Sequence, residues 1–158
     1  MDIKQLSAPF DSSQINWRVG RMSKKKDKAI PFAYLTARDV MDRLDNVFGM
    51  AGWQAEYPFP GCCRIGVLVG RDTKEGHIRE WVWKANCADT TAVEAVKGQA
   101  SDAFKRAAVL FGIGRYLYDF PNFYAPVGQY GYEDETIIQI NSRYEKWIAS
   151  YFNNNEEK

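Results

Sequence analysis

A short stretch near the N-terminus concentrates positive charge. The eleven residues from 18 to 28 hold six cations and one anion. The cations are Arg18, Arg21, Lys24, Lys25, Lys26 and Lys28. Lysine and arginine side chains pair with phosphate oxygens and release the counterions of a nucleic-acid backbone, so this density favours a polyanion partner. A solvated surface hairpin without a ligand is the alternative interpretation of the same run.

Further cations fall on a stretch whose apolar spacing predicts a long helix. Lys105 and Arg106 flank the apolar stripe of this helix, Lys97 lies at the edge of the stripe, and Arg115 follows the helix end. One helix could therefore present several donors to a phosphate backbone.

Aromatic residues make up 15% of the chain, and most of them are expected in the core. Trp81 and Trp83 share one face of a predicted strand, with Val82 on the other. The pair offers a possible platform for stacking bases, but the composition favours a buried face.

Residue types that carry acid–base or metal chemistry are scarce. The only histidine is His77, and no serine or carboxylate pair near it completes a catalytic constellation. Cys62, Cys63 and Cys87 lack the paired spacing of a zinc site, and adjacent strand residues point to opposite faces. We therefore expect no catalytic residue, no metal and no cofactor.

Two enzymatic activities, a metal-dependent nuclease and an ATP-driven activity, are the alternatives to this expectation. A metal-dependent nuclease would need two carboxylates and a lysine on one face, and Asp72, Glu80 and Lys84 do not have the usual spacing. This nuclease stays a weak alternative. The chain has no Gly-Lys-Ser/Thr phosphate loop, so ATP-driven activity is not expected.

The composition is that of one globular domain. The chain has 158 residues, of which 46% are hydrophobic and 26% are charged. No apolar run could span a bilayer, no signal peptide is recognisable, and the odd count of three cysteines predicts free thiols. We expect a cytoplasmic protein, in a bacterium or a phage-infected host. The net charge is +1, but residues 119–158 hold three basic and seven acidic residues, so a basic body carries an acidic tail.

The elements that position these residues follow from hydrophobic periodicity and turn signals. The fold class is α+β, with an antiparallel sheet made of a hairpin plus a three-stranded meander, packed on a long α-helix. We predict a hairpin over 17–22 and 29–34, a helix over 36–48, strands over 53–59, 62–70 and 77–85, a long helix capped at 89–91 and ended by Gly112, an irregular loop over 121–135, and a helix over 137–151.

Two groups of residues resemble one known family. They are YLTARDV at 34–40 leading to FGMAGW at 48–53, and KGQASDAFKRA at 97–107 ending in Phe111-Gly112. Two motifs in the right order are similar to the annealing core of the Rad fifty-two family, in its short phage or bacterial form. The resemblance divides the chain into an N-terminal segment (1–16), an annealing core (17–118), and a C-terminal loop and helix with the acidic tail (119–158).

The resemblance implies an oligomeric ring or helical arc that binds single-stranded DNA in a basic groove. Lys105 and Arg106 match the lysine–arginine pair that lines this groove, and the basic hairpin would lie over it. The implied function is ATP-independent annealing of complementary strands in recombination and repair. A structural oligomer without a ligand is the remaining alternative, besides the nuclease.

Some positions depart from the family pattern. Val109 stands where eukaryotic members carry a further arginine, for which Arg115 could compensate, and Met50 replaces an aromatic residue. The C-terminal extension that recruits a recombinase in eukaryotes is not expected here. Annealing is therefore favoured over recombinase loading, and a single-strand-binding protein or a recombinase is a possible protein partner.

Overall fold

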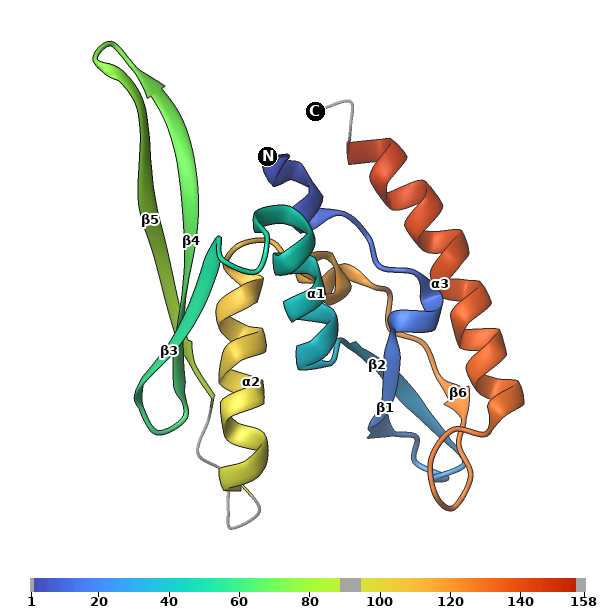
Figure 1. Cartoon of the computed structure of the whole chain (residues 1–158). Helices are drawn as coiled ribbons and strands as arrows, with labels where there is room; N and C mark the ends of the chain where they lie inside the picture. The colour runs from blue at the N-terminus through green and yellow to red at the C-terminus, as the bar shows by residue number, and fades with distance from the viewer. Residues whose placement is uncertain (1, 89–94, 156–158) are drawn as a thin grey trace. The chain divides into compact units, whose positions relative to one another are not determined.

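The chain folds into two compact units. The computed structural model describes the backbone of residues 2–88 and 95–155, and the side chains of 2–88 and 98–153. The first unit contains Met1–Ala8 and Thr36–Arg115, and the second contains Pro9–Leu35 and Tyr116–Lys158. Both are drawn in Figure 1. Among the helices in the described part of the chain, none is long and apolar enough to cross a membrane.

The first unit is built on an antiparallel sheet with the strand order β3-β4-β5. The strands are β3 (Trp53–Phe59), β4 (Cys62–Thr73) and β5 (Gly76–Cys87), and they confirm the predicted meander. Pairing of β4 with β5 continues without a break from Cys62–Cys87 to Thr73–Gly76. Both strands are therefore longer than the sequence pattern predicts, because residues assigned to a polar loop extend the ladder almost to the turn.

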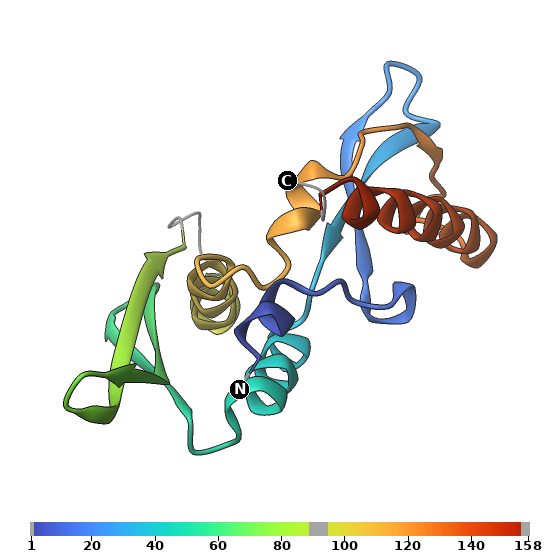
Figure 2. The ribbon, with the colours of Figure 1, turned by 90° about the horizontal axis from the view of Figure 1, so that it is seen from above.

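Two helices belong to the same unit. Helix α1 (Ala37–Phe48) confirms the predicted amphipathic helix: Thr36 and Asp39 form a capping box at its start, and Gly49, with φ of 73°, follows its end. Helix α2 (Ala95–Val109) is the predicted long helix, and its proposed cap at 89–91 lies outside the described residues. Figure 2 shows α2 beside one face of the β3-β4-β5 sheet.

Side chains of the sheet reach α2 and the turn that follows it. The rings of Trp53 and Phe104 lie 5.9 Å apart between centroids. Lys84 donates its Nζ proton to the Leu110 carbonyl over 2.7 Å, and Asn86 donates to the Arg106 carbonyl over 3.4 Å. These contacts define which face of the sheet is turned towards α2.

The second unit contains another small sheet and the C-terminal helix. The strand order is β1-β2-β6, with β1 (Asn16–Met22), β2 (Lys28–Tyr34) and the two-residue β6 (Ala125–Pro126). The β1–β2 hairpin confirms the prediction, whereas β6 falls in a stretch predicted as loop. Helix α3 (Asp134–Asn155) is longer at both ends than the predicted 137–151. The chain is thus α+β, with two three-stranded antiparallel sheets and three α-helices among the described residues. The prediction that the hairpin and the meander form one sheet is wrong, because β2 pairs with β6 and not with a strand of the meander.

A polar network lies inside the aromatic core of the second unit. Tyr144 is 1% exposed and donates its hydroxyl proton to the Phe10 carbonyl over 2.7 Å. The Tyr116 hydroxyl lies 2.8 Å from that of Tyr144 and accepts the Phe10 amide proton. Short 3-10 helices complete the chain: η1 (Ile3–Ser7), η2 (Ser12–Gln14) and η3 (Arg115–Asp119).

The prediction of three free thiols is wrong. Cys62 and Cys87 form a disulfide, and Cys63 is the free, buried cysteine. The physical reason is register: Cys62 and Cys87 are 25 residues apart in sequence but directly opposite each other on β4 and β5. Burial raises the pKa of the Cys63 thiol above its ordinary value, and a hydrogen bond from Tyr57 partly offsets this rise.

Candidate nucleic-acid interface

The β1–β2 hairpin gathers the basic run of the second unit on one exposed ribbon. Its turn is closed by the Ser23 amide, which donates to the Lys28 carbonyl over 2.8 Å, and Lys26 takes a left-handed φ of 58°. Asp27, the lone anion of the run, accepts a hydrogen bond from the Ser23 hydroxyl over 2.8 Å. All six predicted cations of the hairpin are exposed: Arg18, Arg21, Lys24, Lys25, Lys26 and Lys28.

One face of this hairpin also carries exposed aromatic side chains, which the sequence analysis missed. Phe32 is 40% exposed and Tyr34 is 38% exposed. The Arg18 guanidinium lies over the Phe32 ring, 5.9 Å from its centroid. A Cβ at Gly20 would lie 2.5 Å from this ring, so the missing side chain makes room for it. The i, i+2 spacing of Phe32 and Tyr34, opposite a strand that holds Arg18, was the available signal.

Helix α2 places the lysine–arginine pair on the first unit. Ala103, Phe104, Ala107 and Ala108 are buried, so the predicted apolar stripe is confirmed over this stretch. Lys105 and Arg106 are partly exposed. The Arg106 Nε donates to the Asp102 carboxylate one turn earlier over 2.9 Å. The side chain of Lys97 lies outside the described residues.

Arg115 caps the C-terminal end of α2. Its guanidinium donates to the Val109 carbonyl over 2.9 and 3.0 Å and to the Leu110 carbonyl over 2.8 Å. These carbonyls belong to the C-terminal end of α2, where unpaired acceptors and a negative partial charge favour a cation. Arg115 is exposed, but most of its hydrogen-bonding capacity is directed at the backbone.

The three residues of the nuclease alternative, Asp72, Glu80 and Lys84, each have a different partner in the structure. Asp72 lies 2.9 Å from the His77 Nδ1, and Glu80 forms an ion pair with Arg71 at 3.2 Å. Lys84 is engaged by the Leu110 carbonyl. Because Asp72 pairs with His77 across the strands and successive residues alternate between faces, Asp72 and Glu80 lie on opposite faces of the sheet. They do not converge on one metal ion, and no group of three metal-ligating side chains occurs among the described residues.

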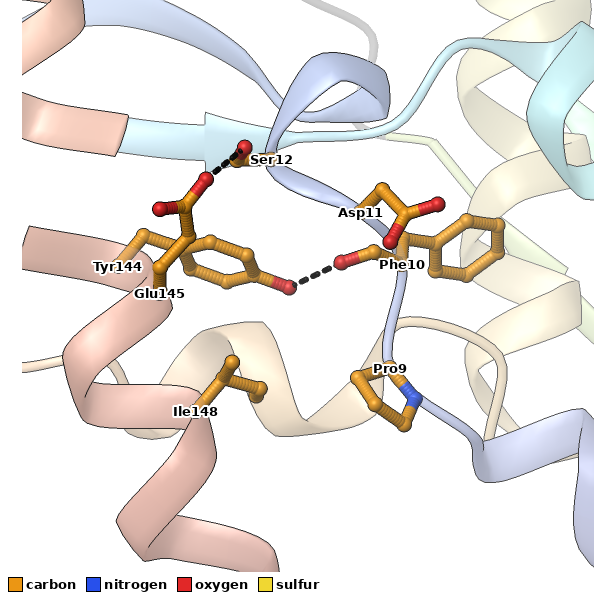
Figure 3. A pocket seen from close by; sticks show the side chains of 7 residues that line it. All are labelled: Pro9, Phe10, Asp11, Ser12, Tyr144, Glu145 and Ile148. Atoms are coloured by element: carbon orange, nitrogen blue, oxygen red, sulfur yellow. Dashed lines mark hydrogen bonds between the residues drawn. The ribbon is translucent and has the colours of Figure 1, made fainter. Parts of the chain in front are cut away.

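A pocket of about 300 Å³ lies elsewhere on the second unit, beside α3 (Figure 3). Tyr144 and Glu145 project from α3, and the Glu145 carboxylate accepts a hydrogen bond from the Ser12 hydroxyl. The charged side chains in its lining are Asp11 and Glu145, both acidic. A phosphate would be repelled there, so the pocket is not part of the candidate interface. Its lining consists of Pro9, Phe10, Asp11, Ser12, Tyr144, Glu145 and Ile148.

The chain is similar to known repair proteins over most of its length. The family model described as "Rad52/22 family double-strand break repair protein" matches residues 3–59 and 61–137. The single-stranded DNA-binding protein DdrA of Deinococcus deserti is 42% identical over 118 residues, which is 75% of this chain and 57% of that protein. DdrA of Deinococcus radiodurans is 38% identical over 122 residues, covering 77% and 57% of the two chains.

This chain therefore matches little more than half the length of these curated relatives. The family model spans both sequence motifs, at 34–53 and 97–112, and both units. The predicted resemblance is confirmed, and the chain belongs to the Rad52/22 family of double-strand break repair proteins.

Proposed function

We propose that the protein binds single-stranded DNA and anneals complementary strands, without ATP, in recombination and DNA repair. The observation that carries the proposal is the exposed β1–β2 hairpin, on which six cations stand beside exposed Phe32 and Tyr34. Cations on an exposed hairpin suit the regularly spaced phosphates of a strand, and aromatic rings suit any base. The names of the DdrA relatives, as single-stranded DNA-binding proteins, support the same ligand.

Annealing needs no catalytic residue in this proposal. Binding through phosphates neutralises the repulsion between two strands and leaves the base edges free to test a complementary sequence, so base pairing supplies the specificity. The hairpin cations Arg18, Arg21, Lys24, Lys25, Lys26 and Lys28 form one set of phosphate contacts. Lys97, Lys105 and Arg106 form a second set on α2, where Arg115 adds charge while it caps the helix.

A homo-oligomer, as a ring or a helical arc, would strengthen such binding. The basic strip of one subunit is modest, and the net charge of the chain is only +1. Repetition of the strip in each subunit converts weak contacts into a continuous track with high effective affinity. A single-strand-binding protein or a recombinase that shares the DNA, in the bacterial or phage-infected cytoplasm, is the protein partner we propose.

The first test is an annealing assay with two complementary fluorescent oligonucleotides, at fixed ionic strength, without ATP or metal. The same sample is measured by light scattering to obtain the mass of the assembly. We expect faster annealing than in a protein-free control, by a species of many subunits. A protein that binds no strand at low salt would contradict the proposal and leave a structural oligomer.

A further inference from the structure

The β3-β4-β5 sheet has one face that α2 does not cover. Lys84 and Asn86 of β5 point towards α2, as their hydrogen bonds to Leu110 and Arg106 show. Because successive residues of a strand point to opposite faces, Trp81 and Trp83 lie on the other face. No described helix or strand of the same unit lies over this face in Figure 2.

The composition-based preference for a buried tryptophan face is therefore wrong for Trp81, which is 39% exposed. Trp83 is partly exposed. An uncovered face with two large indole rings needs an explanation, because scattered single apolar residues are ordinary on a surface whereas a contiguous apolar patch marks a binding site.

The exposed tryptophans belong to an ordered row of side chains on three strands. The Arg64 Nε donates to the Glu56 carboxylate over 2.7 Å, and the Arg64 guanidinium lies 4.6 Å from the centroid of the Trp83 ring. The Trp83 and Trp81 rings lie 6.0 Å apart at an angle of 35°. We call Arg64, Trp83 and Trp81 the tryptophan stripe.

A glycine makes the stripe possible. Gly66 lies directly opposite Trp83, and a Cβ at Gly66 would lie 2.9 Å from three indole atoms. Any other residue would push the ring away. Trp83 therefore packs on the backbone of β4 and is held by Arg64, while Trp81 extends the row towards solvent.

The charges around the stripe suit a nucleic acid. Glu56 is already paired with Arg64, so its charge is compensated. Arg79 lies on the same face as Trp81, two residues away on β5, and it is exposed. Within the described residues, no ion pair or hydrogen bond engages the Arg79 side chain. A planar indole beside a guanidinium is the combination that stacks a base and pairs with its phosphate.

We propose that the tryptophan stripe is a further contact for single-stranded nucleic acid, at which bases stack on Trp81 and Arg79 pairs with the backbone. This inference rests on the proposed function, but it concerns different residues and a different interaction. The cations of the hairpin and of α2 bind phosphates, whereas the stripe adds a base contact on the first unit that tolerates any sequence.

The test compares a deoxythymidine oligonucleotide with an abasic oligonucleotide of the same length, which keeps the phosphates and lacks the bases. Affinities are measured by fluorescence anisotropy at one salt concentration for the unaltered protein, Trp81→Ala and Trp81→Phe. Tyr130→Ala is the matched control, because Tyr130 is 96% exposed and lies on the other unit. Light scattering gives the mass of every variant.

We expect Trp81→Ala to weaken deoxythymidine binding by about five-fold or more, the effect of one lost stacking contact, and to leave abasic binding unchanged. Trp81→Phe should retain most of the affinity, since it keeps an aromatic face. Tyr130→Ala should change neither. The ratio of the two affinities isolates the bases from the phosphates.

Three results would overturn the inference. An unchanged affinity ratio in Trp81→Ala removes base stacking from this face. Equal losses for both strands with a reduced assembly mass assign the face to a contact between copies of the chain. A failure of the unaltered protein to bind either strand refutes the proposed function itself, and the stripe with it.

Discussion

Two arginines of the candidate interface, Arg106 and Arg115, also have hydrogen-bond partners within the fold. Arg106 is paired with Asp102, but both partners are about half exposed, so the pair is a weak surface ion pair that a phosphate can replace. Arg115 differs, because its guanidinium donates to the carbonyls at the end of α2. The two arginines are equally basic in sequence and have different local partners.

The first prediction concerns Lys105 and Arg106. The variant with Lys105→Ala and Arg106→Ala should weaken single-strand binding and lower the slope of log affinity against log salt by about two, since each residue neutralises one phosphate. Affinities measured at several salt concentrations give the slope. Asp102→Ala is the matched control: it removes the carboxylate that pairs with Arg106 and should leave the slope unchanged or raise it. A double variant with an unaltered slope would remove the pair from the interface.

At the scale of elements, the β1–β2 hairpin combines a regular ladder with a turn made almost entirely of lysine. The turn holds its shape through Ser23 and Asp27, which bond to each other and to the chain beside them. The lysines themselves are exposed and contribute charge rather than structure. They can therefore be replaced without loss of the hairpin, provided that the residue placed at position 26 tolerates a positive φ.

The second prediction uses this independence. The variant with Lys24→Ala, Lys25→Ala and Lys26→Asn should slow annealing more than it weakens single-strand affinity, if the turn captures a second strand. Asparagine is chosen at 26 because it tolerates the left-handed φ of 58°. Annealing rate and single-strand affinity are measured in parallel, with Lys146→Ala on α3 as control. Equal losses in both measurements would argue against a separate role for the turn.

At the scale of the whole molecule, the two units depend on different stabilising features. The second unit is held by an aromatic core with buried tyrosine hydroxyls that are hydrogen-bonded. The first unit has the buried side chains of β4 and α2 and a disulfide between Cys62 and Cys87. The disulfide closes a loop that contains all of the β4–β5 hairpin, so it restricts the unfolded chain.

The third prediction follows from that restriction. The variant with Cys62→Ser and Cys87→Ser should lose about 3.5 kcal/mol of unfolding free energy, the loop-closure value for a loop of this size. Urea unfolding of the protein, followed by tryptophan fluorescence, measures the loss. Reductant should reproduce it in the unaltered protein and have no effect on the variant. A stability equal to that of the unaltered protein under oxidising conditions would contradict a stabilising disulfide.

Elements whose signals are local could be predicted from the sequence. Helix α1 has its cap, its apolar spacing and its final glycine within 14 residues, and the meander and the basic hairpin have the same kind of short-range signal. The family was also decided at this level, because the two motifs are contiguous runs of residues. Charge density identified the cations of the hairpin, whereas apolar spacing and the family resemblance identified those on α2.

Features that depend on residues distant in the chain became clear from the folded structure. The Cys62–Cys87 disulfide follows from the register of β4 and β5, which places the two cysteines opposite each other. Trp81 is exposed because α2 covers the other face of the sheet. The role of Arg115 as a cap depends on where α2 ends. In each case the sequence specifies which residue types are present, whereas strand pairing and helix packing specify which atoms are in contact. Separation along the chain does not give the distance in space between two such residues.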